Sequence, residues 1–373
     1  MHRIESDNVD ITAGKNQFKD GPPGTTVNAA IMNAMQEEIC NAIVGGGLTL
    51  KTKLTDTHDQ LNSVIQNLAY KNGRSATYIF ASSDSESKSQ GGADQIISTS
   101  ADAAAIIKAK AAELSALNGG LILCLEGTYN CYTELDWSSF VDLIGCGYRT
   151  VFKRQAGITY VIDSSAVENC LFSNFRINGN KGIFPGAYTG IIGKTASYTS
   201  EYERIISHNN GANGFLNCNQ LSNCYSYSNT TYGFSNCKQS SNCYSYSNTL
   251  DGLINCYQLS NCYSYSNLNS GFLYCNQLSN CYSYLNGSRG FTACNQLSNC
   301  YAQKNSSSGF VLCKQLVACK SISNAVSQYH YTSCWPMQQC VGASGGSAWR
   351  SCFADHAGTS AVADTAAGGY NYA

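Results

Sequence analysis

Apolar and polar positions alternate in short runs through the second half of the chain, and the pattern repeats at a fixed interval. Between residues 211 and 324, cysteines are separated alternately by six and thirteen positions, which makes each unit 19 residues long. A repeat of this size predicts a solenoid in which each unit is one coil. The cysteines are Cys218, Cys224, Cys237, Cys243, Cys256, Cys262, Cys275, Cys281, Cys294, Cys300, Cys313 and Cys319.

The residues of one unit favour strands over helices. The unit CNQLSNCYSYSN at 218–229 has no apolar residues at helical spacing, and its Tyr, Ser, Asn and Cys are typical of short strands and turns. Stacked coils place residue i beside residue i+19, about 4.8 Å away, where asparagines form ladders. We therefore expect an all-β solenoid, a right-handed parallel β-helix with 19-residue coils. A leucine-rich repeat does not fit, because only one Leu recurs per unit.

One irregular unit indicates which side chains point inward. Nineteen residues before Cys224 lies Ile205, so this position accepts an apolar side chain and faces the interior. Because side chains alternate along a strand, Cys224 and Ser226 are expected to point inward, and Tyr225 and Tyr227 outward.

The repeated cysteines have three possible roles. Two cysteines of one coil are separated by six extended residues, about 20 Å, which is too far for a disulfide. Cysteines of adjacent coils are close enough, but folding in the cytoplasm favours thiols. Zinc sites usually combine CxxC pairs with histidine, and the repeat has neither. We expect buried free thiols; disulfides and bound metal are the alternatives.

The remainder of the chain divides into four parts by its pattern. Apolar residues at four-residue steps predict one helix in 25–44, and a second amphipathic pattern occupies 56–70. The stretch ADAAAIIKAKAAELSAL predicts a helix that covers the open end of the solenoid. The expected organisation is a small α-helical region at 1–80, a linker or loop at 81–93, the capping helix within 94–120, the β-helix at 121–345 and a C-terminal cap at 346–373.

Composition narrows the classes of partner. The 373 residues carry a formal net charge of −1 without a basic cluster, which argues against nucleic acid. The chain has no run of 18 apolar residues, so the sequence predicts no membrane-spanning helix. The stretch MHRIESDNVD lacks the features of a signal peptide. We expect synthesis and assembly in the cytoplasm, with no cofactor and no metal.

Two stretches carry a resemblance to a known family. MHRIESDNVD, with KDGPPGTTVNAAIMNAMQEEICNAI, resembles the N-terminal segment of tail fibre and tail spike proteins of Mu-like phages and prophages. AAAIIKAKAAELSALNGGLILCLEGTY is similar to the capping helix and first strand of phage β-helix proteins of the pectate-lyase-like superfamily. The residues that carry these resemblances are Thr25, Asn33, Gln36, Glu37, Glu38, Ile39, Gly119, Gly120, Gly127, Thr128 and Tyr129.

The resemblance implies a component of the virion tail. Its members are homotrimers whose N-terminal part, here residues 1–80, attaches to tail or baseplate proteins. Their β-helix meets the host surface, where many members cleave polysaccharide and others only bind it. For this chain we expect a binder of a host-surface receptor, with a depolymerase (hydrolase or lyase) or a purely structural tail component as alternatives.

The distribution of acidic residues is the reason for expecting a binder. Glycoside hydrolysis usually needs two carboxyl groups, and Asp251 is the only acid between 211 and 324. The better catalytic candidates are Glu201, Glu203 and His208, which share one irregular unit. The simpler interpretation is an exposed strand edge for the two glutamates and a surface position for His208. Glu134, Asp136 and Asp142, nearer the capping helix, are further candidates.

The tyrosines are the candidate receptor-binding residues. Two outward rows would form a flat aromatic strip on which sugar rings could stack, beside amides that reach sugar hydroxyls. Stabilisation of the coil by ring stacking, or burial between chains of a trimer, are the competing interpretations. The residues are Tyr225, Tyr227, Tyr244, Tyr246, Tyr263, Tyr265, Tyr282 and Tyr284.

Overall fold

The computed structural model describes residues 9–10, 17–18, 76–194, 200–324, 331–343 and 349–350. The chain forms two compact units, Met1–Ala76 and Thr77–Ala373. In the first, β1 (Val9–Asp10) pairs antiparallel with β2 (Gln17–Phe18). The helices predicted at 25–44 and 56–70, and nearly all of the predicted cap at 346–373, lie outside the described residues.

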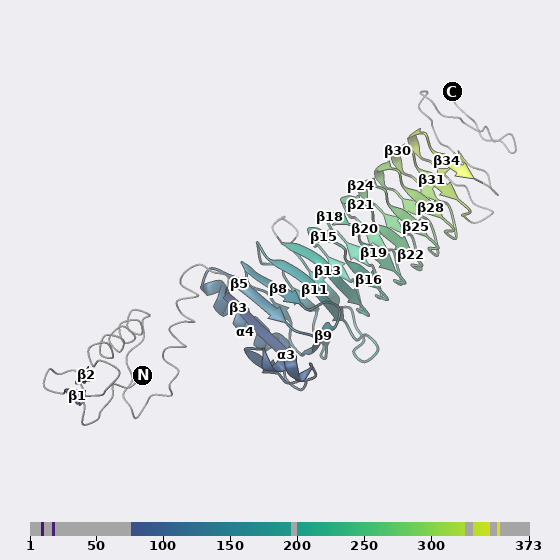
Figure 1. The fold of residues 1–373 in the computed structure, drawn as a ribbon. Coiled ribbons are helices and arrows are strands. Elements are labelled where there is room, and N and C mark those ends of the chain that lie inside the picture. Colours follow the sequence, from purple (N-terminus) through teal and green to yellow (C-terminus); the bar gives the residue numbers. More distant parts are fainter. Residues whose placement is uncertain are drawn as a thin grey trace. The chain divides into compact units, whose positions relative to one another are not determined.

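The second unit is a parallel β-solenoid (Figure 1). From Phe215 onward each coil has three short strands, and each strand pairs in parallel with its counterpart in the next coil. Tyr225, for example, pairs with Tyr244. The predicted 19-residue register is confirmed as far as Phe310, which then pairs with Tyr331 at a spacing of 21 residues.

The first strands of successive coils form an 11-stranded sheet. They are β7 (Leu135–Asp136), β10 (Tyr160–Asp163), β12 (Thr189–Ile192), β14 (Phe215–Leu216), β17 (Phe234–Ser235), β20 (Leu253–Ile254), β23 (Phe272–Leu273), β26 (Phe291–Thr292), β29 (Phe310–Val311), β32 (Tyr331–Thr332) and β35 (Trp349–Arg350).

The second and third strands of the coils make up the other two sides. The second strands are β15 (Gln220–Ser222), β18 (Gln239–Ser241), β21 (Gln258–Ser260), β24 (Asn276–Ser279), β27 (Asn295–Ser298), β30 (Lys314–Val317) and β33 (Trp335–Gln338). The third strands are β16 (Tyr225–Tyr227), β19 (Tyr244–Tyr246), β22 (Tyr263–Tyr265), β25 (Tyr282–Tyr284), β28 (Tyr301–Gln303), β31 (Lys320–Ile322) and β34 (Val341–Ala343).

The N-terminal coils are less regular and have longer strands. A single strand, β13 (Glu201–His208), spans the second and third sides of its coil, because it pairs with both β15 and β16. The other strands here are β3 (Ala76–Ser82), β4 (Gln95–Ile97), β5 (Gly120–Cys124), β6 (Gly127–Cys131), β8 (Val141–Gly145), β9 (Thr150–Arg154) and β11 (Leu171–Asn178).

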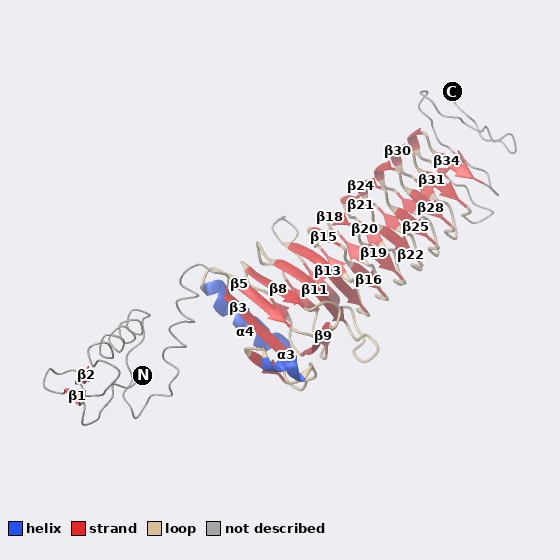
Figure 2. Cartoon of the chain, viewed as in Figure 1, coloured by secondary structure: helices blue, strands red, loops and turns tan. Residues whose placement is uncertain are grey.

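A helix lies at the N-terminal end of the solenoid (Figure 2). This helix, α4 (Ala103–Ala116), falls within the predicted 101–117 and begins after Asp102, whose side chain accepts a hydrogen bond from the Ala104 amide. It buries Ile107, Ala111 and Leu114 against β5 to β8. Because α4 covers the interior of the first coil, the apolar side chains there are kept from water.

In the segment 81–93, predicted to be a linker or loop, the structure has regular elements as well as turns. This segment includes the end of β3 and the short helix α3 (Ser87–Gly91), and it belongs to the solenoid unit. Ser82 is fully buried, and its hydroxyl donates to the Thr128 carbonyl at 2.9 Å. Ser85 is also buried and donates to the Glu126 carbonyl. Backbone carbonyls of the neighbouring coil therefore satisfy the hydroxyls of these two buried serines.

The cysteines belong to the core, as predicted. All cysteines of the described residues are free, and all of them except Cys146 are buried. Their thiols donate to backbone carbonyl groups. Cys262 Sγ, for example, lies 3.4 Å from the carbonyl oxygen of Ser260 and 3.3 Å from the carbonyl oxygen of Ser240. Burial raises the pKa of Cys256 and Cys275, so these thiols stay protonated. Ile205 is fully buried in the equivalent position.

An asparagine ladder closes each coil. Asn229 Nδ2 donates to Ser226 Oγ at 3.0 Å and to Asn248 Oδ1 of the next coil at 2.9 Å, and the same pattern continues along the ladder. Ser226 Oγ in turn donates to the Gly233 carbonyl at 2.8 Å. A Cβ atom on Gly233 would meet Ser245 Oγ at 2.0 Å, so the repeated glycine leaves room for this serine.

Candidate functional site

In each regular coil, the outer faces of the second and third strands differ and meet at a corner. In the coil of Gln220, the corner residue Asn223 has a left-handed φ of 54°, a conformation that asparagine tolerates better than most residues. The second strand before the corner exposes Gln220 and Ser222, whereas the third strand after it exposes Tyr225 and Tyr227. Stacking of coils turns these into a glutamine–serine face and a tyrosine face.

The tyrosines point outward in two rows, as predicted. Cys224 and Ser226 are fully buried between them, and the tyrosines are half-exposed; Tyr263 is 38% exposed. Their rings stack on one another: Tyr225 and Tyr244 have centroids 4.8 Å apart with planes 6° from parallel, and Tyr246 and Tyr265 have the same separation and angle. The pair Tyr263–Tyr282 is tilted, by 50° at 5.9 Å.

This stacking determines what the tyrosine face offers to a ligand. Offset neighbours cover part of each ring face, so the phenol oxygens and ring edges are the accessible parts. Burial, followed by the adjacent phenols, raises the pKa of Tyr246 to about 12 and also raises those of Tyr244 and Tyr265. The phenols therefore remain neutral hydrogen-bond donors, and a sugar ring has little free aromatic face on which to stack.

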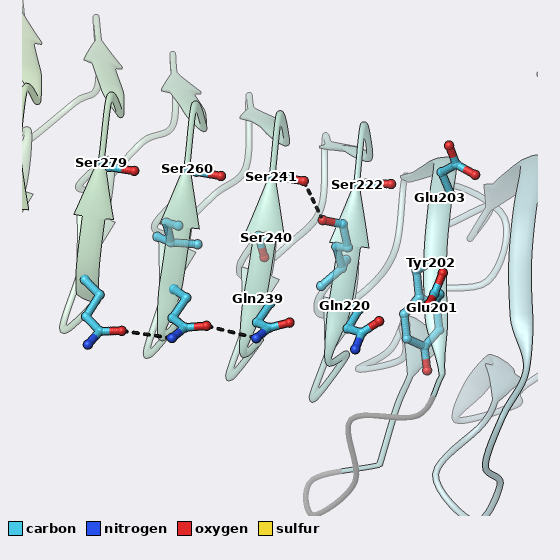
Figure 3. Close-up of a pocket in the computed structure, with 14 residues that line it drawn as sticks. Glu201, Tyr202, Glu203, Gln220, Ser222, Gln239, Ser240, Ser241, Ser260 and Ser279 are labelled. Atoms are coloured by element: carbon cyan, nitrogen blue, oxygen red, sulfur yellow. Dashed lines mark hydrogen bonds between the residues drawn. The ribbon is translucent and has the colours of Figure 1, made fainter.

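The glutamine–serine face is hollowed into a groove of about 540 Å³. Figure 3 shows Gln220 and Gln239 in one row and Ser222 and Ser241 in a parallel row. The glutamines form a partial ladder, since Gln239 Nε2 donates to Gln258 Oε1 at 2.9 Å, and Gln258 Nε2 to Gln277 Oε1 at 3.1 Å. We call this hollow the amide–hydroxyl groove; it is lined by Glu201, Tyr202, Glu203, Gln220, Leu221, Ser222, Gln239, Ser240, Ser241, Gln258, Leu259, Ser260, Gln277 and Ser279.

Two of the predicted catalytic candidates lie at one end of this groove. In the pairing register, Glu201 precedes the glutamine row and Glu203 precedes the serine row. Glu201 is exposed, whereas Glu203 Oε1 lies 2.8 Å from Arg204 Nη1. Because the two glutamates alternate with buried Tyr202 on β13, both carboxylates belong to the same outer face.

His208, the third candidate, does not join them. It pairs with Tyr227 in the tyrosine face, and the expected surface position is wrong, because only 7% of the residue is exposed. Its ring stacks on that of Tyr227 at 4.8 Å, and neither ring nitrogen has a hydrogen-bond partner. Burial, with Arg176 as the lesser cause, lowers the pKa of His208 to about 4.

The remaining candidate carboxylates near the capping helix, and that of Asp251 in the regular coils, form hydrogen bonds or ion pairs with neighbouring elements. Glu134 Oε1 accepts a hydrogen bond from the Thr159 amide at 2.7 Å, and Asp142 Oδ1 accepts one from the Leu171 amide at 2.8 Å. Asp136 pairs with Lys108. Asp251 is buried and accepts from the Ser270 amide at 2.8 Å. These contacts join neighbouring coils or the helix to the solenoid.

The glutamine row was missed by the sequence analysis, although a signal was present. Glutamine recurs with the 19-residue period at Gln220, Gln239, Gln258, Gln277 and Gln296, next to the more conspicuous cysteines and tyrosines. What the repeat did not reveal is the concavity, which depends on how the coils stack. Among the described residues, no cluster of three His, Cys, Asp or Glu could hold a metal ion, and no helix is long and apolar enough to cross a membrane.

Comparison with known proteins reveals a shared fold. No family model and no curated protein matches the chain. The A-module of the mannuronan C-5 epimerase AlgE4 from Azotobacter vinelandii is similar, with 16% identity over 68% of this chain and 88% of that one and a TM-score of 0.57. The AlgE6 A-module of the same organism has 14% identity, covers 68% and 86%, and has a TM-score of 0.58.

A phage protein is also similar, but more distantly. The tailspike protein gp49 of Acinetobacter baumannii bacteriophage Fri1, a capsular polysaccharide depolymerase, has 11% identity over 74% of this chain and 59% of that one, with a TM-score of 0.44. At these identities the two epimerase modules indicate the fold alone, and the tailspike likeness is too weak to add to it.

Proposed function

We propose that this chain is a phage or prophage tail fibre or tail spike protein that binds a host-surface glycan in the amide–hydroxyl groove. The observation that carries the proposal is the groove itself, in which rows of amides and hydroxyls continue from coil to coil over a hollow surface. Attachment to the tail through residues 1–80 and assembly as a homotrimer are parts of the proposal that rest on the sequence resemblance.

The chemistry of the lining suits a polysaccharide. Each glutamine amide both donates and accepts hydrogen bonds, as does each serine hydroxyl, and sugar hydroxyls need partners of both kinds. Five coils contribute to the groove, from Glu201 to Gln277, which gives a length of about 19 Å at the usual strand spacing. This length accommodates a short stretch of a linear glycan that runs along the solenoid.

The tyrosine rows are proposed as a second, weaker contact with the receptor. Their neutral phenols can donate hydrogen bonds at the edge of the face, while their stacking stabilises the coils. In a trimer, three copies of a weak site would act together on a dense glycan surface and bind it through avidity.

Binding to purified envelope polysaccharide from candidate hosts tests the proposal. In the full chain, replacement of Gln239 and Gln258 by Ala should weaken binding at least tenfold, measured by calorimetry. The matched control replaces Gln296 and Gln315, which continue the same row beyond the groove. Equal affinity of the two double variants would reject the groove as the binding surface.

A depolymerase is the second candidate, favoured by the position of Glu201 and Glu203. Residues two apart on a strand point to the same face and have Cα atoms about 6.6 Å apart, so their side chains can bring two carboxyl groups within the roughly 6.5–9.5 Å used by inverting glycosidases.

Chain length of the polysaccharide distinguishes the two candidates. If the protein is a depolymerase, size-exclusion chromatography should show shortened polysaccharide after incubation with the native protein. The Glu201→Gln and Glu203→Gln variants should then leave it intact while still binding it. Unchanged chain length with the native protein favours the binder.

A further inference from the structure

The amide–hydroxyl groove has a distinctive distribution of charge. Its fourteen lining residues include two carboxylates, Glu201 and Glu203, and neither Lys, Arg nor His. Both carboxylates lie at the same end, and from Gln220 to Ser279 every lining side chain is uncharged. A ligand in the groove would therefore contact neutral dipoles along most of its length and negative charge at one end.

The basic residues close to the groove leave one of the two carboxylates, that of Glu201, without an ion pair among the described residues. Arg204 pairs with Glu203 at 2.8 Å, and Lys194 lies 2.6 Å from Glu168. Lys238 precedes Gln239 in the chain but is not part of the lining. Other cations border the tyrosine face, where Lys304 lies over the Tyr284 ring and Lys320 over the Tyr301 ring.

We infer that the groove selects a glycan that is uncharged or carries amino groups, and rejects polyanionic glycans such as polyuronates. This inference rests on the proposed function and assigns a substrate class to the same groove. Sugar carboxylates and phosphates are normally recognised by Arg or Lys, which supply charge-assisted hydrogen bonds. Glutamine and serine supply only neutral ones, and these also suit hydroxyl and acetamido groups.

The two glutamates disfavour anionic sugars and favour cationic ones. An anionic sugar placed over the first coil would lie beside Glu201 and Glu203, and like charges in contact repel each other. A protonated amine in the same place would be attracted to Glu201, which is exposed and forms no ion pair with any described residue. The attraction should weaken as salt is added, because the carboxylate is exposed to solvent.

Three oligosaccharides of equal length test the inference with the full chain. They are a glucosamine hexamer at a pH at which its amines are protonated, the N-acetylated hexamer, and a mannuronate hexamer. We expect the first two to bind and the third to bind at least tenfold more weakly. Glu201→Gln should weaken binding of the glucosamine hexamer about two- to fivefold, the strength of an exposed ion pair, and leave the N-acetylated hexamer unchanged.

The decisive comparison uses variants that add positive charge to the groove. Gln239→Lys combined with Gln258→Lys should weaken the glucosamine hexamer and strengthen the mannuronate hexamer. Gln315→Lys adds a positive charge to the same row outside the groove and should change neither. Thermal unfolding of each variant verifies that it is folded.

The outcomes separate this inference from the proposed function. Tight binding of the mannuronate hexamer by the native protein would overturn the charge selection and leave glycan binding intact. If Gln239→Lys with Gln258→Lys leaves binding unchanged, the glycan binds outside the groove, and the inferred charge selection is also overturned. If neither these oligosaccharides nor the envelope polysaccharides bind, the proposed function fails, and the inference fails with it.

Discussion

The tyrosine face and the glutamine–serine face are built from the same repeat, but they differ in how closely the side chains of each face contact one another. Stacked tyrosines contact each other at 4.7 to 4.9 Å over most of both rows, and partial burial raises the pKa values of Tyr244 and Tyr246. Gln239, Gln258 and Gln277 are exposed, and two amide–amide hydrogen bonds join them.

This difference separates stability from recognition. A side chain that already contacts its copies above and below gains little from a ligand but stabilises the coil. A flexible exposed amide contributes little to stability, and it can exchange water for a sugar hydroxyl. We therefore expect substitutions on the tyrosine face to act mainly on unfolding, and substitutions in the groove to act mainly on binding.

The largest effect is expected on the tyrosine face. Replacement of Tyr244, Tyr246, Tyr263 and Tyr265 by Ser removes five ring pairs, at about 0.5–1.5 kcal/mol each, so the free energy of unfolding should fall by about 2.5–7.5 kcal/mol. Thermal unfolding followed by circular dichroism measures this change.

The matched control replaces the same four tyrosines by Phe. Stacking is retained and the hydroxyls are lost, so stability should stay close to that of the native chain. If the Ser variant unfolds at the native temperature, the rows do not stabilise the coils. If the Phe variant loses glycan binding, the phenols belong to the receptor site.

Acid should destabilise the protein through His208, at the end of one tyrosine row. Its pKa is about 4 when folded and about 6.5 when unfolded, so between these values the unfolded state binds the extra proton. Stability should therefore fall as pH drops from 6.5 towards 4, by about 3 kcal/mol in total. Below pH 4 this contribution no longer changes.

His208→Tyr continues the tyrosine row and should remove this pH dependence. The measurement compares the unfolding temperature of the native chain and the variant between pH 7 and pH 4.5, since all other titrating groups are shared. Parallel curves would show that His208 titrates normally, and hence that its burial has been misjudged.

A smaller gain in stability is expected under the groove. Ser240 interrupts a row of buried leucines between Leu221 and Leu259, and its hydroxyl is buried without a hydrogen-bond partner. Ser240→Leu should restore the row and stabilise the chain by about 1–3 kcal/mol, because it buries apolar surface and removes an unsatisfied hydroxyl. A lower unfolding temperature would mean that the neighbouring coils leave no room for the larger side chain.

The smallest effect on stability is expected in the groove itself. Gln239→Ala with Gln258→Ala should change the free energy of unfolding by only about 0.5 kcal/mol, as is usual for exposed positions. A large destabilisation would show that the amide ladder supports the coils as the tyrosines do, and the contrast between the two faces would disappear.

Much of the fold could be predicted from the repeat. Cys224 and Ser226 inward, Tyr225 and Tyr227 outward, and the asparagine ladder all follow from the 19-residue period and the alternation of side chains. The differences occur where the repeat is absent or imperfect. Residues 81–93 are polar but form part of the solenoid, and His208 is buried because the coils around it cover its ring.

The sequence by itself determined the coil, its register and which side chains face outward, because each of these depends on residues one period apart. Only the tertiary structure decided that the tyrosine rings lie against each other while the glutamines line a hollow. It also decided that Glu201 and Glu203 lie at the end of that hollow and His208 elsewhere. Concavity and ring orientation depend on the stacking of several coils at once, and no single repeat encodes them.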